Sequence, residues 1–437
     1  QATLALCAWV DVHSGRPAKM GALLSEPVTA MVVEKSFSES MAATAVTMQG
    51  WRKTHEDEHI LRCGCGGGEE CGVFAVLDGH GGQSAADVAA GTLQEILSGI
   101  AKWGTLDPPT AAKALEEAFV EADTRLRAVL PADDRSGTTV VAAIITQPRP
   151  GEYCVQLAHC GDSRAVLHAG SRLVCSRDHK PGREDETRRI VAAGGTVEHG
   201  PLGGGPLRVD GALAVSRALG DFHFKPAEVD AALCKVTAVP EVQTVRNVSV
   251  GDWLLLACDG VFDVMENEEV NDFIDLRVKQ AAPAPVDGSQ VLSELLQLCL
   301  DKGSKDNCTA CLVQLMAPGV ISVSPGPSRT LLPGRCATAA PDAKEKYIQF
   351  FESHGFRDEA KELQAEHEGP PAPAQGDAAP PPPPRASGSG PLPAAGAQRQ
   401  IVALAKAMQA MRSTRTIQAA WRARRGSADG GTGNKST

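Results

Sequence analysis

Short apolar runs that end on glycine or on acidic residues recur along this chain. Runs of roughly four to eight apolar or β-branched residues between such turn signals are typical of buried strands. We expect strands over residues 138–145, 153–158, 164–168 and 309–315. Because the loops between the first three are of hairpin length, these strands are expected to pair in antiparallel fashion.

Other stretches repeat apolar residues every three or four positions, which is the period of an amphipathic helix. The clearest covers residues 110–130, where Leu115, Phe119, Ala122 and Leu126 share one face. Further helices are expected over residues 83–99, 184–193 and 289–300. Since the predicted strands come in runs with helices grouped between them, we expect an α+β fold of antiparallel sheets covered by helices.

Composition divides the 437 residues into a globular part and a tail. We expect one domain over residues 20–317, preceded by an upstream or disordered segment over residues 1–19. The segments that follow are a linker rich in Pro, Ser and Gly (318–341), a helical segment (342–368), a proline-rich linker (369–397), a basic amphipathic helix (398–425) and a disordered tail (426–437).

Two features bear on membranes. No apolar run approaches the roughly 20 residues that span a bilayer. The stretch from Met20 to Ser25 (MGALLS) fits an N-myristoylation signal if translation begins at Met20. The alternative is an internal Met-Gly pair without a lipid. We therefore expect membrane association only if Gly21 is myristoylated.

The thirteen cysteines are scattered without a disulfide framework, and several lie inside apolar runs. This usage is typical of reduced core residues in a cytoplasmic or nuclear protein. Cys63, Cys65 and Cys71 form the one cluster. It is either a zinc or redox site or part of a glycine-rich hairpin loop, and the missing fourth ligand favours the loop.

The charge is unevenly distributed. Residues 398–425 carry seven Lys and Arg and no acidic residue, whereas the whole chain has a net charge of −10. Residues 426–437 sum to zero, which leaves −17 on residues 1–397. An acidic body fits an enzyme that binds cations and argues against nucleic acid as a partner.

Carboxylates stand where four of the apolar runs begin or end: Glu56 with Asp57, Asp78, Asp259 and Asp306. If these groups converge, each close pair repels by roughly 4 kcal/mol at an effective dielectric of about 20, so the cluster requires cations. Ligand sets made only of oxygen select hard ions such as Mg²⁺ or Mn²⁺. The pattern predicts a hydrolase that uses two metal ions.

A series of motifs accompanies these carboxylates in a fixed order. They include MQGWRKTHEDEH (48–59), VFAVLDGHGG (73–82), SGTTVVAAII (136–145), CGDSRAVL (160–167), DHKP (178–181), LAVSRALGDFHFK (213–225), LACDGVFDV (256–264) and KDNCTACLV (305–313). With them, residues 20–317 resemble the metal-dependent protein serine/threonine phosphatases of type 2C. The resemblance implies two stacked antiparallel sheets with a helical layer on each side. It also implies hydrolysis of phosphoserine and phosphothreonine in proteins by a water that two metal ions activate.

The resemblance also implies a set of metal ligands. It assigns Asp78 to both Mg²⁺ or Mn²⁺ ions, the Gly79 carbonyl and Glu56 to one ion, and Asp259 and Asp306 to the other. Asp57 would ligate directly or through water. Asp162 and Asp263 resemble the ligands of a weaker third metal site. Asn307 is expected to orient Asp306 or a metal-bound water.

Two further side chains are expected to act on the phosphate ester. His80 resembles the general acid of the family, which protonates the departing serine or threonine oxygen. Arg52 carries a guanidinium that suits the phosphate oxygens. The alternatives are a structural histidine in a glycine-rich turn and an arginine in a surface salt bridge. His55 departs from the family, which usually has an apolar residue there, but this change removes no proposed ligand.

Other classes of protein fit less well. Cysteine-based phosphatases need C-x₅-R, whereas only three residues separate Cys160 from Arg164, and no G-x-x-x-x-G-K-[ST] loop is present. The alternative to an enzyme is a non-catalytic scaffold that binds phosphoproteins through the C-terminal extension. For the enzyme, we expect a monomer whose partners are phosphoprotein substrates.

The basic tail has a recognition pattern of its own. Ile417, Gln418 and Arg422 match the start of an IQ motif, and an apolar stripe that includes Leu404 and Met408 precedes it among basic residues. We therefore expect residues 398–425 to bind calmodulin or another EF-hand protein. The alternatives are a solvated basic tail and a tail that docks on the acidic body.

Overall fold

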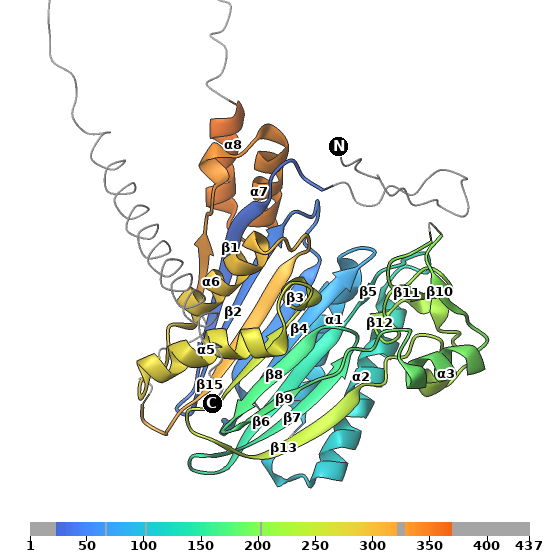
Figure 1. Ribbon diagram of the computed structural model, residues 1–437, viewed down its shortest axis with the longest axis horizontal. Coiled ribbons are helices and arrows are strands. Elements are labelled where there is room, and N and C mark those ends of the chain that lie inside the picture. The colour runs from blue at the N-terminus through green and yellow to red at the C-terminus, as the bar shows by residue number, and fades with distance from the viewer. Residues whose placement is uncertain (1–22, 66–67, 101–102, 202, 321–327, 369–437) are drawn as a thin grey trace, which may run out of the picture. The chain divides into compact units, whose positions relative to one another are not determined.

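The computed structural model describes residues 23–65, 68–100, 103–201, 203–320 and 328–368. These residues form two seven-stranded antiparallel sheets that lie face to face, with helices on the outer faces (Figure 1). The segments predicted over residues 1–19 and 369–437 lie outside the described residues. The myristoylation signal, the proline-rich linker and the basic helix therefore remain predictions.

The first sheet has the strand order β16-β1-β2-β15-β14-β8-β9. Its strands are β1 (Val28–Phe37), β2 (Met41–Gly50), β8 (Arg164–Ala169), β9 (Arg172–Cys175), β14 (Trp253–Ala257), β15 (Cys308–Leu315) and β16 (Ser328–Leu332). Strands β2, β14 and β15 are buried along their whole length. Because both faces of these strands are covered, β14 and β15 read as almost continuous apolar runs instead of alternating patterns.

The second sheet has the order β12-β5-β4-β6-β7-β13, and β3 pairs with β4 outside this path. Its strands are β3 (Asp57–Cys65), β4 (Gly68–His80), β5 (Gly137–Thr138), β6 (Val140–Arg149), β7 (Glu152–Cys160), β12 (Leu219–Gly220) and β13 (Glu241–Ser249). A separate hairpin pairs β10 (Val197–His199) with β11 (Leu207–Val209). The strands predicted over residues 138–145, 153–158, 164–168 and 309–315 are confirmed, and no end differs by more than four residues.

Helices cover the outer face of each sheet (Figure 1). They are α1 (Ser84–Gly99) and α2 (Pro108–Val129) on the second sheet, and α5 (Asn267–Ala281) and α6 (Gly288–Asp301) on the first, with α3 (Glu184–Ala192) beside the hairpin and the short α4 (Asp259–Phe262) after β14. Short 3₁₀ turns lie at η1 (Trp103–Thr105), η2 (Phe222–Phe224), η3 (Ala231–Leu233) and η4 (Cys336–Thr338). Helix α2 has an ordinary start. Asp107 caps it by accepting a hydrogen bond from the Thr110 amide, and a proline occupies the first helical position, where no backbone N–H is needed.

The central core lies between the two sheets. Phe74 and Val141 from the second sheet and Leu254 and Cys311 from the first belong to one buried apolar cluster. Two further clusters fill the space between each sheet and its helices. This arrangement confirms the predicted fold of two stacked antiparallel sheets flanked by helical layers.

The region after β15 differs from the prediction of a linker over residues 318–341. Residues 328–332 form β16, which pairs with β1 at the edge of the first sheet. Two helices follow, α7 (Pro341–Ser353) and α8 (Arg357–Glu368), and pack on β1 through Tyr347, Phe350 and Phe351. The linker prediction is wrong for β16 because a short exposed edge strand needs no apolar run to form.

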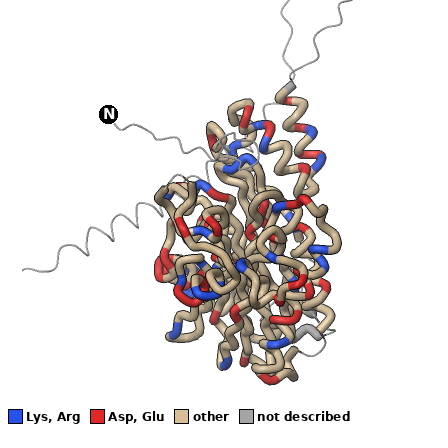
Figure 2. Tube along the Cα trace, turned by 90° about the vertical axis from the view of Figure 1, so that its right-hand side faces the viewer, with Lys and Arg blue, Asp and Glu red and all other residues tan. Residues whose placement is uncertain are grey.

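Two further observations concern the described residues. Ten of their cysteines are free, whereas Cys71 is disulfide-bonded, so the prediction of reduced thiols is wrong at that position. None of the described helices has the length and apolar character needed to cross a membrane. Figure 2 shows acidic residues interspersed with basic ones over the described part of the chain.

Candidate metal centre

Strand pairing places two of the predicted carboxylates side by side. β3 begins at Asp57, and its antiparallel register sets Asp57 directly opposite Asp78, two residues before the end of β4. Ligand atoms of Asp57, Asp78 and Cys258 lie within 4.8 Å of one another. The second sheet therefore delivers both of these aspartates to one point.

The first sheet delivers the other two carboxylates from neighbouring strands. β14 ends at Ala257, one residue before the Cys258 that precedes Asp259 at the first position of α4. β15 begins at Cys308, just after Asp306 and Asn307. Because Ala257 pairs with Ala310 in the antiparallel ladder, both strand ends lie at the same edge of the sheet.

The charges of these carboxylates act on one another. Burial and then the charge of Asp259 raise the pKa of Asp78 well above its usual value, and Asp57 and Asp306 add to the effect. Burial, followed by the charges of Asp162 and Asp306, likewise raises the pKa of Asp259. Mutual repulsion at this level indicates a site that is built to hold positive charge.

Asp57 shows how the cluster is prepared for a cation. Its carboxylate is 2% exposed, and burial raises its pKa to about 7. One oxygen, Oδ2, accepts a hydrogen bond of 2.6 Å from the Thr309 hydroxyl. The other, Oδ1, is buried without a hydrogen-bond partner. An orphaned buried carboxylate oxygen is costly in a folded protein unless a cation or a water bound to one satisfies it.

Close backbone packing explains why a glycine follows Asp78. A Cβ atom at Gly79 would overlap the carbonyl oxygen of Glu56, to which the Gly79 amide donates a hydrogen bond of 3.1 Å. The Glu56 side chain accepts from the Thr54 hydroxyl at 2.8 Å and from the Gly82 amide at 3.2 Å. Glu56 and Gly79 are thus held in contact beside Asp78, as the ligand prediction requires.

The predicted role of Asn307 as an orienting residue fits its contacts. Its side-chain amide donates to the carbonyl oxygens of Gln49 and Thr54 and accepts from the Glu56 amide, at 2.8, 3.0 and 3.0 Å. The Asn307 amide also donates to Asp306 at 2.8 Å. Asn307 therefore connects the loop that carries Glu56 to the strand that follows Asp306.

Arg52 lies beside the cluster and contacts Asp306 directly. Its guanidinium donates to the Asp306 carboxylate, yet its side chain is 52% exposed. Burial lowers the pKa of Arg52, but Asp306 and Asp259 outweigh that effect and raise it. The salt bridge named as an alternative is present, and the same guanidinium borders the proposed metal centre.

The two carboxylates of the predicted third site differ in their surroundings. Asp162 is buried and forms an ion pair with Lys180 of the DHKP motif, whereas Asp263 is exposed at the end of α4. Both charges raise the pKa of Asp259. Asp162 and Asp263 therefore lie near the carboxylate of Asp259. The sequence prediction did not include the Lys180 ammonium group beside Asp162.

His80 has a partner that the sequence prediction missed. Its Nε2 atom lies 2.7 Å from Oδ2 of Asp221, a carboxylate that is 1% exposed. Burial opposes protonation of His80, but the charge of Asp221 outweighs it and raises the pKa of the imidazole. A Cβ at Gly137 would overlap both groups, so this glycine leaves room for the pair. The only sequence signal was the position of Asp221 within the LAVSRALGDFHFK motif.

Two more histidines, His159 and His179, contact the loop that carries Lys180. The rings of His159 and His179 stack with their centroids 4.5 Å apart. His159 donates to the Arg177 carbonyl at 2.9 Å, and His179 accepts from the Gly161 amide at 3.2 Å. Burial lowers the pKa of both imidazoles, to about 4 for His179.

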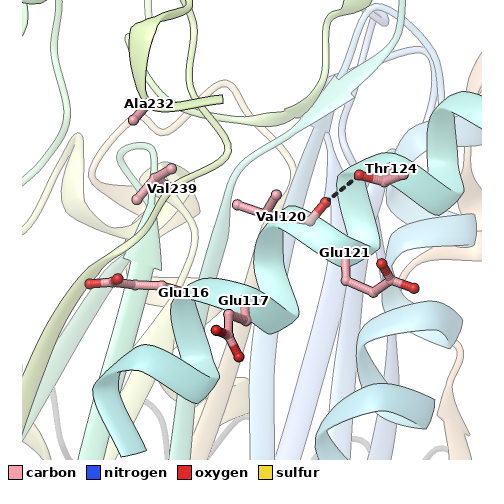
Figure 3. Close-up of a pocket in the computed structure, with 7 residues that line it drawn as sticks. All are labelled: Glu116, Glu117, Val120, Glu121, Thr124, Ala232 and Val239. Atoms are coloured by element: carbon pink, nitrogen blue, oxygen red, sulfur yellow. Dashed lines mark hydrogen bonds between the residues drawn. The ribbon is translucent and has the colours of Figure 1, made fainter. Parts of the chain in front are cut away.

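A hollow outside this centre lies along α2. Figure 3 shows Glu116, Glu117, Val120 and Glu121 on α2, with Ala232 and Val239 on neighbouring segments that also line the hollow. Its described lining includes none of the predicted ligands or catalytic residues. We assign it no chemical role.

The stacked sheets and the carboxylates at their shared edge define a metal-dependent hydrolase. Residues 41–308 match the family model "Protein phosphatase 2C", and the chain belongs to this family. It is a protein serine/threonine phosphatase that depends on metal ions and acts on phosphoproteins.

Individual relatives agree with this assignment. "Probable protein phosphatase 1N" of Mus musculus is 37% identical over 309 residues, covering 70% of this chain and 72% of that protein. "Protein phosphatase 1A" of Homo sapiens is 33% identical and covers 70% of this chain and 78% of its own length. Among solved structures, a phosphatase from Toxoplasma gondii aligns with a TM-score of 0.58 and 25% identity, over 69% of this chain and 99% of that one.

Proposed function

We propose that the acidic cluster holds two Mg²⁺ or Mn²⁺ ions and that the chain hydrolyses phosphoserine and phosphothreonine at this point. The observation that carries the proposal is the convergence of Asp57, Asp78, Asp259 and Asp306 from both sheets, although burial raises the pKa of each. When bound, the ions supply Lewis-acid activation of a water and neutralise the charge of the phosphate.

The ligand roles are those that the resemblance to the family implies. Asp78, which faces Asp57 in the strand register, would contact both ions. Glu56 and the Gly79 carbonyl would hold one ion, Asp259 and Asp306 would hold the other, and Asp57 would contribute its unpartnered Oδ1 directly or through water. Asp162 and Asp263 would hold a weaker third ion.

Two residues act on the substrate. His80, kept protonated by Asp221, donates its proton to the departing serine or threonine oxygen. Arg52, which is half exposed, turns its guanidinium toward the equatorial oxygens of the phosphate. His80 and Arg52 thus both lie beside the acidic cluster.

Hydrolysis of p-nitrophenyl phosphate by the full chain, with and without Mn²⁺, tests this function. We expect Asp78→Asn and Asp259→Asn to abolish metal-dependent turnover and to leave the circular-dichroism spectrum unchanged. Turnover near that of the wild type at saturating Mn²⁺ in either variant would contradict the ligand assignment. Phosphopeptide binding without any turnover by the wild type would favour the scaffold alternative.

We also propose regulation through the tail, on sequence grounds alone. Residues 398–425 bind calmodulin or another EF-hand protein through their basic amphipathic pattern. Titration of a 398–425 peptide into calmodulin, with and without Ca²⁺, tests this, and affinity no better than millimolar under both conditions would contradict it. The enzyme is proposed to be a cytoplasmic or nuclear monomer that reaches membranes only if Gly21 is myristoylated.

A further inference from the structure

A chain of buried hydrogen bonds leads from the proposed ligand Asp57 across the paired strands β15 and β2 to His55. The Thr309 hydroxyl lies 2.6 Å from Asp57 Oδ2, and the Thr47 hydroxyl lies 2.6 Å from that of Thr309. His55 Nε2 lies 2.7 Å from the Thr47 hydroxyl. These four side chains are between 0% and 7% exposed, so water does not compete for the bonds.

The chemistry of the four groups fixes the direction of every proton. An ionised Asp57 only accepts, so Thr309 uses its single hydroxyl proton on Asp57. Thr47 must then donate to Thr309, and its own oxygen is left to accept from His55. His55 therefore carries its proton on Nε2, and its buried Nδ1 has no hydrogen-bond partner.

Helix α7 closes the outer end of this chain. The ring of His55 meets Phe350 edge-on at 5.3 Å between centroids and His354 at 5.0 Å. Phe350 and His354 are themselves 1% and 8% exposed. The segment after β15 thus packs against the residue that immediately precedes the proposed ligands Glu56 and Asp57.

We infer that His55 is a positioning residue that orients the metal-ligating carboxylate of Asp57 through Thr47 and Thr309, and that α7 holds His55 in place. The inference rests on the proposed metal centre. With Oδ2 engaged by this relay, Oδ1 is the oxygen of Asp57 that would be free to bind a cation. An apolar side chain at position 55 would have no N–H to donate, so the route from α7 to the proposed metal centre depends on the imidazole of His55.

The test measures Mn²⁺ binding to the full chain by titration calorimetry, with phosphatase activity recorded in parallel. Removing an outer-shell hydrogen bond typically weakens metal affinity by about 10- to 100-fold, so we expect a loss in that range for Thr309→Val. For His55→Leu, two bonds further out, we expect about a three- to tenfold loss. His55→Gln offers an amide N–H in place of Nε2–H and should retain affinity within about twofold of the wild type.

Two controls separate positioning from general destabilisation. Tyr347→Phe removes a buried hydroxyl on α7 that bonds to Thr29 and lies outside the relay, so Mn²⁺ affinity should stay unchanged. The double variant His55→Leu/Thr309→Val should bind Mn²⁺ no more weakly than Thr309→Val alone, because both changes break one relay.

Unchanged Mn²⁺ affinity in His55→Leu, additive losses in the double variant, or a loss in Tyr347→Phe equal to that in His55→Leu would each overturn the inference. The same measurements keep it distinct from the proposed function. A wild type that binds Mn²⁺ but does not hydrolyse phosphate would contradict the function, whereas the affinities of the variants would still decide the relay.

Discussion

The ion pair between His80 and Asp221 allows the proposed general acid to be weakened without touching a proposed metal ligand. Asp221→Asn removes the charge that keeps the His80 imidazole protonated and oriented. Asp221 has a left-handed backbone conformation with φ of 51°. Asparagine adopts this conformation readily, so the substitution should preserve the turn.

The expected magnitude follows from the type of bond that is lost. A hydrogen bond to a charged group contributes about 1.5–3 kcal/mol. If this energy is expressed in the transition state for proton donation, the turnover of a phosphoserine peptide falls about 10- to 150-fold. Hydrolysis of p-nitrophenyl phosphate should change much less, because nitrophenolate departs without a proton.

The assay compares kcat for the two substrates at saturating Mn²⁺. Asp210→Asn is the matched control, since Asp210 also has a left-handed conformation, with φ of 50°, and forms an ion pair with Lys235. We expect this control to keep both activities. Equal losses on the two substrates in Asp221→Asn would refute the acid role of His80 and make the pair a support for the metal centre.

Three further predictions concern stability and the glycine beside the metal centre. In EDTA, the melting temperature should fall as the pH rises from 3.8 toward about 7. The reason is that the unfolded chain loses the Asp57 proton at a lower pH than the folded chain does. Added Mn²⁺ should reduce this dependence of the melting temperature on pH. Glu186→Gln removes a buried carboxylate and leaves the half-buried Arg217 guanidinium without its partner, so it should cost about 3–5 kcal/mol in urea unfolding; no loss would contradict the ion pair. Gly79→Ala should cost about 1–3 kcal/mol and weaken Mn²⁺ binding in calorimetry, because the added methyl overlaps the Glu56 carbonyl; wild-type affinity would contradict the close packing.

The regular elements were predictable because their patterns are local. Helix α2 was predicted over residues 110–130 and covers Pro108–Val129, and the strand predicted over residues 309–315 covers Cys308–Leu315. The predicted start of α2 came two residues too late because the two prolines were left outside the helix. Asp107 as the capping residue with a proline at the first position is an ordinary helix start. Strand β16 was missed because its stability comes from pairing with β1, which is nearly three hundred residues away in sequence.

The site was predictable only where a motif carries a residue. Glu56, Asp78, Asp259 and Asp306 follow from the resemblance, and the structure brings together the strand ends on which they lie. Asp221 was missed because its partner lies 141 residues earlier, and a buried aspartate in a turn has no distinct pattern. His55 was recognised as a departure from the family, but its purpose depends on α7, whose docking no local pattern predicts.

Lys180 gives a physical reason why the proposed third metal site would bind its ion more weakly than the proposed pair of sites. Its ammonium group forms an ion pair with Asp162, and the charges of Asp162 and Asp259 raise its pKa even though burial lowers it. A cation entering between Asp162 and Asp263 must therefore displace a positive charge that the protein already supplies. Asp57, Asp78 and Asp259 have no such built-in cation within hydrogen-bonding distance among the described residues, since Arg52 contacts only Asp306. This difference in charge compensation predicts weaker cation binding at the proposed third site, where Lys180 competes, than at the proposed pair of sites, where Arg52 contacts one ligand, Asp306.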